Sequence, residues 1–206
     1  MKWKFLSNGF IYGIVQDIIG GTRARKLAIE RIIKDNPRLK GQELTVLDVG
    51  CGPGDILRWL PKSWKYFGID ISSDYIKLAK KKWSTRGMFV QGKSCDIINL
   101  VPQNSQDIIL FLGVLHHLDS RQVVQSLINA KRVLKETGFV YALEPAFTNG
   151  QTKISKFIMQ LDRGSFIREI NDWEELCKSV FQKVEVRWLP GALRIPYYKI
   201  TISMPA

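Results

Sequence analysis

The chain has 206 residues, of which 45% are hydrophobic and 24% charged, a balance typical of a globular protein with a sizeable core. No apolar run approaches the roughly 18 residues that a membrane helix needs, so we expect one cytoplasmic domain over residues 1–206. Three widely spaced cysteines and two adjacent histidines predict neither a disulfide framework nor a metal site.

The net charge of +12 favours anionic partners, such as nucleic acid, a membrane surface contacted peripherally, or an acidic substrate. Much of the excess lies in residues 1–42 and 77–86. A solvated basic face explains the same balance, so charge alone does not choose a function. Nothing in the composition indicates an oligomeric state.

Residues 1–40 are predicted to form a helical cap. Apolar residues recur at helical spacing between Phe10 and Ile19, and a second such pattern runs from Thr22 until Asn36 and Pro37 end it. Because this segment precedes the first strand, we expect it to lie over a functional site. Its aromatic residues are most simply core, but Tyr12 is a candidate substrate contact.

The most informative stretch is TVLDVGCGPGD, residues 45–55. A β-branched apolar run followed by glycines at 50, 52 and 54 predicts a buried strand and a tight loop that lets backbone approach a ligand. The third glycine of a dinucleotide fingerprint would fall at Asp55, and the G-K-[ST] ending of a P-loop is absent. Residues 56–60 could then begin a helix.

Strand and helix patterns alternate from residue 45 to residue 144. Strands are expected at 66–71, 86–91, 107–112 and 139–143, with helices over 72–82 and 120–134. This alternation predicts a doubly wound α/β fold with a mostly parallel sheet. Residues 147–165 are expected to form a lid-like insertion, Asn171 or Asp172 to cap a helix, and residues 183–206 to form an antiparallel β-hairpin.

Five motifs, taken in order, resemble those of class I S-adenosylmethionine-dependent methyltransferases: TVLDVGCGPGD, GIDIS, CDI, ILFLGVLHHL and LKETGFVYALEP. The resemblance covers residues 44–145, which would be the cofactor-binding core. It implies a seven-stranded sheet with an antiparallel last strand, and S-adenosylmethionine as cofactor. The LHHL form is similar to the small-molecule and lipid-quinone methylases of the family. The N-P-P-[YF] tetrad of many amino-group methylases is absent.

The resemblance also implies a cofactor site at the carboxyl ends of the strands. Asp48 would lie near the ammonium of the cofactor, Asp70 would accept both ribose hydroxyls, and Asp96 would accept from the adenine amino group. N–H groups of the glycine loop and of the following helix would suit its carboxylate. The full set is Asp48, Gly50, Cys51, Gly52, Gly54, Asp70, Ile71, Asp96, Ile97, Leu112 and Gly113.

Methyl transfer mainly requires alignment of nucleophile, methyl and sulfur, and a base is needed only if the nucleophile must lose a proton. His116, His117 and Glu144 lie at the ends of the fourth and fifth expected strands and are the candidates for that role. His116 is also a candidate substrate contact. Packing at a helix start would explain the two histidines equally well.

The leading hypothesis is methyl transfer to a small or lipid-like acceptor, anionic ones included. One alternative is an RNA methyltransferase that uses Lys77–Arg86 and the basic N-terminal helices as a phosphate track. A second alternative is a non-methylating protein that binds the same cofactor, because the motifs describe the donor site and not the acceptor.

Overall fold

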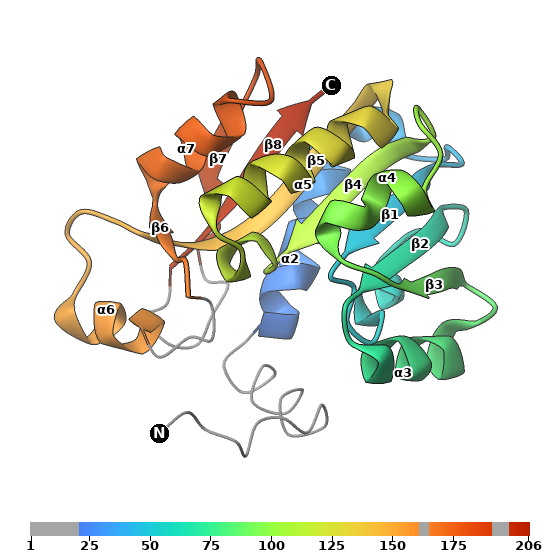
Figure 1. Cartoon of the computed structure of the whole chain (residues 1–206), viewed down its shortest axis with the longest axis horizontal. Coiled ribbons are helices and arrows are strands. Elements are labelled where there is room, and N and C mark those ends of the chain that lie inside the picture. Colours follow the sequence, from blue (N-terminus) through green and yellow to red (C-terminus); the bar gives the residue numbers. More distant parts are fainter. Residues whose placement is uncertain (1–20, 161–164, 191–197) are drawn as a thin grey trace.

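The computed structural model describes residues 21–160, 165–190 and 198–206 (Figure 1). Tyr12 and the first of the two expected cap helices lie outside these residues. So do residues 161–164 of the expected lid and residues 191–197 of the expected hairpin.

The fold is built on one mixed sheet with the strand order β3-β2-β1-β4-β5-β8-β7, and a short β6 pairs with β5. Strands β1 to β5 are mutually parallel, whereas β8 is antiparallel to both β5 and β7. The expected doubly wound, mostly parallel sheet with an antiparallel last strand is therefore confirmed. The bounds are β1 Thr45–Val49, β2 Lys65–Asp70, β3 Gly87–Gln91, β4 Gln106–Leu112, β5 Leu134–Phe147, β6 Arg168–Glu169, β7 Glu185–Trp188 and β8 Lys199–Pro205.

Helices cover both faces of the sheet. One core lies between the sheet and α2, η3 and α3, and the other lies between the sheet and α4, α5 and α7. Figure 1 shows α5 and α7 side by side in front of the strands, with α6 beyond the end of β5. The α-helices are α2 Gly21–Asp35, α3 Ser73–Trp83, α4 Ile97–Leu100, α5 Ser120–Val133, α6 Lys153–Gln160 and α7 Ile170–Lys178; the 3-10 helices are η2 Pro37–Leu39, η3 Asp55–Arg58, η4 Ser94–Asp96 and η5 Leu115–His117.

Three boundaries differ from the sequence expectations. The segment after the glycine loop forms only the single turn η3, because Pro61 cannot continue a helix and disfavours helical backbone at the residue before it. The fifth strand begins at Leu134, earlier than expected, and runs on to Phe147. Helix α7 begins at Ile170, and Asp172 reaches back to accept from the N–H of Glu169 at 3.3 Å.

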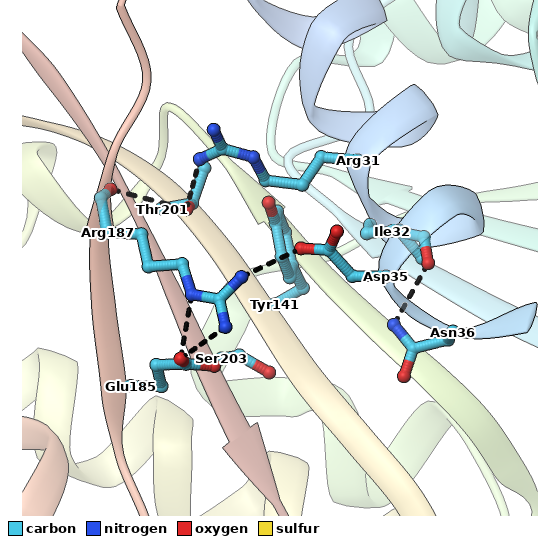
Figure 2. Close-up of a pocket in the computed structure, with 9 residues that line it drawn as sticks. All are labelled: Arg31, Ile32, Asp35, Asn36, Tyr141, Glu185, Arg187, Thr201 and Ser203. Carbon is cyan, nitrogen blue, oxygen red and sulfur yellow. Dashed lines mark hydrogen bonds and ion pairs between the residues drawn. The ribbon is translucent and has the colours of Figure 1, made fainter.

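The described part of the cap, α2, is tied to the antiparallel end of the sheet. Arg31 Nη1 donates to the carbonyl oxygen of Trp188 at 2.7 Å. Arg187 pairs with Asp35 at 3.0 Å (Figure 2). A polar cavity of about 130 Å³ lies between these groups. It abuts β5, β7 and β8 rather than the carboxyl ends of β1 to β4. Its lining residues are Arg31, Ile32, Asp35, Asn36, Tyr141, Glu185, Arg187, Thr201 and Ser203.

Gly50 is expected to be the most sensitive glycine of the loop. Its φ is +75°, and a Cβ there would lie 2.3 Å from Val114 Cγ2. Left-handed backbone and overpacking should together lower the free energy of unfolding of Gly50→Ala by about 3 kcal/mol. Urea denaturation measures this loss.

Gly150→Ala is the matched control, because Gly150 has a φ of +80° with nothing within 4 Å of the added Cβ. Only the backbone cost of about 1 kcal/mol should remain. Equal losses for the two variants would contradict the close approach of Val114 to the loop.

Candidate functional site

The carboxyl ends of the parallel strands bring most of the expected site residues to one edge of the sheet. The glycine loop follows β1, Asp70 ends β2, η4 follows β3, the His116 turn follows β4, and Glu144 lies near the end of β5. In open α/β sheets, ligands bind at this edge, where the strand order reverses. Here the reversal falls between the neighbours β1 and β4.

The glycine loop is folded back onto β2. Gly50 N and Cys51 N donate to the carbonyl oxygen of Ile69 at 2.7 and 3.0 Å, and Gly52 N donates to Asp70 Oδ2 at 2.8 Å. Gly54 N donates to Cys51 O at 3.0 Å. These N–H groups are therefore used within the protein. The expected binding of a cofactor carboxylate by loop and helix N–H groups stays a prediction.

Asp70 keeps spare capacity to accept hydrogen bonds. Its Oδ2 accepts from Gly52 N and its Oδ1 from Ser72 N, each at 2.8 Å. A carboxylate offers about four lone-pair sites, so about two remain for a ligand. Two backbone donors fix the orientation of the group at the strand end, which is what recognition of a diol requires.

Asp48 pairs in register with Gly68, two residues before Asp70, so it lies further inside the sheet. It is 2% exposed. Its Oδ2 accepts from the hydroxyl of Tyr66 at 2.6 Å. Burial raises the pKa of Asp48 to about 7, against the opposing effects of the Tyr66 hydrogen bond and the charge of Arg25. Sequence reasoning missed Tyr66. The signal that could have found it is a tyrosine at the start of the strand expected beside the one that carries Asp48.

The residues expected near an adenine ring divide between surface and core. Ile71 is 65% exposed beside Asp70, whereas the side chain of Ile97 is fully buried, so only the backbone of Ile97 is left to face a ligand. Asp96 Oδ2 accepts from Lys93 N at 3.1 Å within its own turn. That bond fits a turn residue, and a carboxylate with further lone pairs still fits the expected acceptor.

Glu144 is 0% exposed, and four donors converge on its carboxylate. Val114 N and Leu115 N donate to Oε1 at 3.0 and 2.9 Å. His116 supplies the other two donors, because its backbone N lies 3.3 Å from Oε2 and its ring Nδ1 lies 2.6 Å from the same oxygen. Burial would raise the pKa of Glu144, but the charge and hydrogen bond of His116 and the two backbone donors outweigh it, and the pKa is lowered.

The ionised Glu144 fixes the tautomer of His116. A carboxylate can only accept, so the neutral ring carries its proton on Nδ1 and leaves the lone pair on Nε2. His116 Cε1 lies 3.8 Å from the place where a Cβ of Gly113 would stand. The ring therefore lies close to the glycine that follows β4, whose last residue, Leu112, is buried.

The two histidines differ in their surroundings. His116 is 5% exposed, whereas His117 is exposed, and their ring centroids lie 4.1 Å apart. Among the sequence candidates, His116 thus has the geometry of a base oriented by a carboxylate, and Glu144 has that of the orienting group rather than of a group facing a substrate. In the described residues, no group of histidine, cysteine and acidic side chains could hold a metal ion.

Comparisons with known proteins agree with this geometry. Residues 46–138 match the family model of a methyltransferase domain. A SAM-dependent methyltransferase from Archaeoglobus fulgidus superposes with a TM-score of 0.67 at 16% identity, over 88% of this chain and 94% of the other. Residues 46–138 form a class I, S-adenosylmethionine-dependent methyltransferase domain.

Two further solved structures share the fold of this methyltransferase. The protein PH0226 from Pyrococcus horikoshii has a TM-score of 0.65 at 19% identity, over 86% of this chain and 89% of the other. The plantazolicin methyltransferase BamL, solved with a desmethyl analogue and SAH, has a TM-score of 0.69 at 15% identity, over 89% and 85% of the two chains. No curated protein matches the sequence. In the part of the methyltransferase that the structure describes, no helix could span a membrane.

The raised pKa of Asp48 predicts a pH-dependent stability of the ligand-free methyltransferase. The unfolded carboxyl titrates near 3.8 and the folded one near 7, so the folded state binds more protons between these values. The contribution of Asp48 is therefore most favourable at low pH and falls as the pH rises to about 7, by up to about 4 kcal/mol. Relative to wild type, Asp48→Asn should gain stability between pH 5 and pH 8 in urea denaturation.

Asp107→Asn is the control, because the pKa of Asp107 is lowered where that of Asp48 is raised. Burial tends to raise the pKa of Asp107, but its bonds to Lys135 and Thr45 outweigh this and lower it. Asp107 is then ionised in both folded and unfolded states above pH 5, so the loss caused by Asp107→Asn should stay constant from pH 5 to pH 8. A pH-independent difference for Asp48→Asn would contradict the burial of its charge.

Proposed function

We propose that the methyltransferase transfers the methyl group of S-adenosylmethionine to a small, partly apolar acceptor, with His116 as general base. The observation that carries this proposal is the buried Glu144–His116 pair, whose Nδ1 to Oε2 distance is 2.6 Å. A buried carboxylate that accepts from one ring nitrogen orients the ring and would stabilise the imidazolium formed when the other nitrogen takes a proton.

The residues at the strand ends fit S-adenosylmethionine. Asp70 would accept from the two ribose hydroxyls with its remaining lone pairs, and the exposed Ile71 beside it would cover the adenine face. Asp48 would stabilise the ammonium group, directly or through water, once its carboxyl is ionised. Gly113 has a φ of +84° and no side chain, which leaves room for the methionine part next to His116.

When bound, the sulfonium makes its methyl carbon electrophilic, and the protein has to align an acceptor with it. Transfer would form a bond from the acceptor atom to the methyl carbon and break the bond from that carbon to sulfur, with S-adenosylhomocysteine as the leaving group. His116 Nε2 would take the proton that the acceptor loses. Glu144 would stabilise the resulting imidazolium without receiving the proton itself.

Exposed apolar side chains in the insertion after β5 favour a partly apolar acceptor. Ile154 and Phe157 of α6 are 68% and 61% exposed, and Phe166 is 40% exposed. Phe166 N donates to the carbonyl oxygen of His116 at 3.1 Å, which brings this segment against the turn of the base. Lys153 and Lys156 on α6 are also exposed and would favour an anionic group on the acceptor.

An RNA acceptor is the second candidate, because α3 presents exposed lysines. Two of them already have acidic partners, since Lys77 pairs with Asp74 at 3.5 Å and Lys82 with Asp55 at 3.3 Å. Exposed lysines with local partners are weaker support than an oriented base. Methylation of RNA that falls steeply with salt would favour this candidate.

The test uses S-adenosylmethionine with a labelled methyl group and a panel of phenols, quinols, hydroxylated fatty acids and RNA. We expect label on an apolar acceptor. For that acceptor, His116→Gln should lower kcat by about 10² to 10⁴, because a general base contributes that much. Calorimetry should give unchanged affinity for S-adenosylhomocysteine.

His117→Gln is the matched control, since it alters the neighbouring exposed ring. It should leave kcat close to that of wild type. Equal turnover in the two variants would remove His116 from the role of base. Absence of label on every acceptor would favour a non-methylating function.

A further inference from the structure

Arg168 is a buried cation next to η5, the turn that contains His116. The sequence patterns do not single out this arginine. It lies in β6 and is 9% exposed. Its Nη1 donates to Phe166 O at 2.9 Å, and its Nη2 donates to Leu118 O at 2.9 Å and lies 3.4 Å from Ser120 Oγ. One guanidinium thus joins β6 to the segment between η5 and α5.

The contacts of Arg168 lead to both members of the Glu144–His116 pair. Leu118 directly follows the turn that contains His116. Phe166 accepts from Arg168 through its carbonyl oxygen and donates its own N–H to His116 O at 3.1 Å. On the other side, the guanidinium stacks 4.7 Å from the ring centre of Trp173. Trp173 Nε1 donates to Pro145 O at 3.0 Å, at the residue after Glu144.

The charge of Arg168 is not needed by its hydrogen-bond acceptors, which are two carbonyls and a hydroxyl. Burial lowers the pKa of Arg168, and the negative charge of Glu144 is the largest opposing influence. Arginine nevertheless stays protonated in proteins. A buried cation of this kind is costly unless a charge nearby offsets the cost, and the buried Glu144 is the acid that acts on it most strongly.

We propose that Arg168 is a positioning residue for His116. Its guanidinium holds the η5 turn against β6 and its charge favours the ionised form of Glu144, so that Nδ1 of His116 stays bonded to the carboxylate. This inference rests on the proposed function, in which His116 is the base. The competing explanation is a purely structural link between β6, α5 and α7.

The histidine tautomer distinguishes the two explanations without any acceptor. The chain contains only two histidines, so the full-length protein labelled with ¹⁵N-histidine gives two imidazole spin systems, and His117→Gln assigns them. In the wild type at pH 8, His116 should be the Nδ1–H tautomer, with an Nδ1 proton that exchanges slowly with water.

Arg168→Met keeps much of the side-chain volume and removes the charge and the donors. We expect it to give a mixture of His116 tautomers and at least tenfold faster exchange of the Nδ1 proton. Arg168→Lys keeps the charge but cannot bond all three acceptors, so it should retain the Nδ1–H tautomer while exchange accelerates. The lysine variant decides the matter if the methionine variant does not fold.

Arg86→Met is the matched control. Arg86 donates to the carbonyls of Lys62 and Pro61 at 2.9 and 3.3 Å, so it loses comparable bonds away from the His116 turn. It should leave the His116 signals as in the wild type. Wild-type tautomer and exchange in the folded Arg168 variants would overturn the inference even if their stability fell.

The two proposals fail separately. If His116→Gln keeps full turnover while Arg168→Met alters the His116 tautomer, the proposed base is wrong and the positioning by Arg168 stands. If His116→Gln abolishes turnover while the Arg168 variants leave the tautomer unchanged, the base stands and the positioning is refuted.

Discussion

The carboxylate of Glu144 is the group on which the geometry of the site depends. A charge with 0% exposure is stable in the interior only if donors surround it, and here three successive N–H groups and a ring nitrogen do so. The need to satisfy this charge fixes the turn after β4 against the end of β5. It also sets the tautomer of His116, so a stability requirement and an orientation requirement are met by the same four contacts.

Much of the fold could be predicted because its signals are local. The apolar run ending at Val49 with its glycines, and the nearly continuous apolar run of β4, are periodic features that a single sequence displays. The position of Asp70 could be predicted for the same reason, because it ends an apolar strand pattern. The single turn at η3 was missed because the effect of Pro61 had to be weighed against the apolar residues before it. Strand β6 has two residues and no pattern to detect.

The site was predictable as a set of residues but not as a set of roles. The sequence offered His116, His117 and Glu144 as candidates without separating their roles, because burial and hydrogen-bond partners distinguish them only after folding. Arg168 and Tyr66 act across contacts between segments distant in the chain, for which no local pattern exists. The family model covers residues 46–138 only, so the domain's shared motifs give no guidance on the acceptor.

The central claim is that the donated methyl group emerges beside His116. The most direct measurement is an isotope-filtered nuclear Overhauser experiment on the full-length protein with S-adenosylmethionine carrying a ¹³C-methyl group. We expect a cross-peak between that methyl and the Hε1 proton of His116, assigned with His117→Gln, and its loss when Asp70→Ala removes the ribose contact. Saturating cofactor that gives no such cross-peak in the wild type would contradict the placement of the methyl group beside His116.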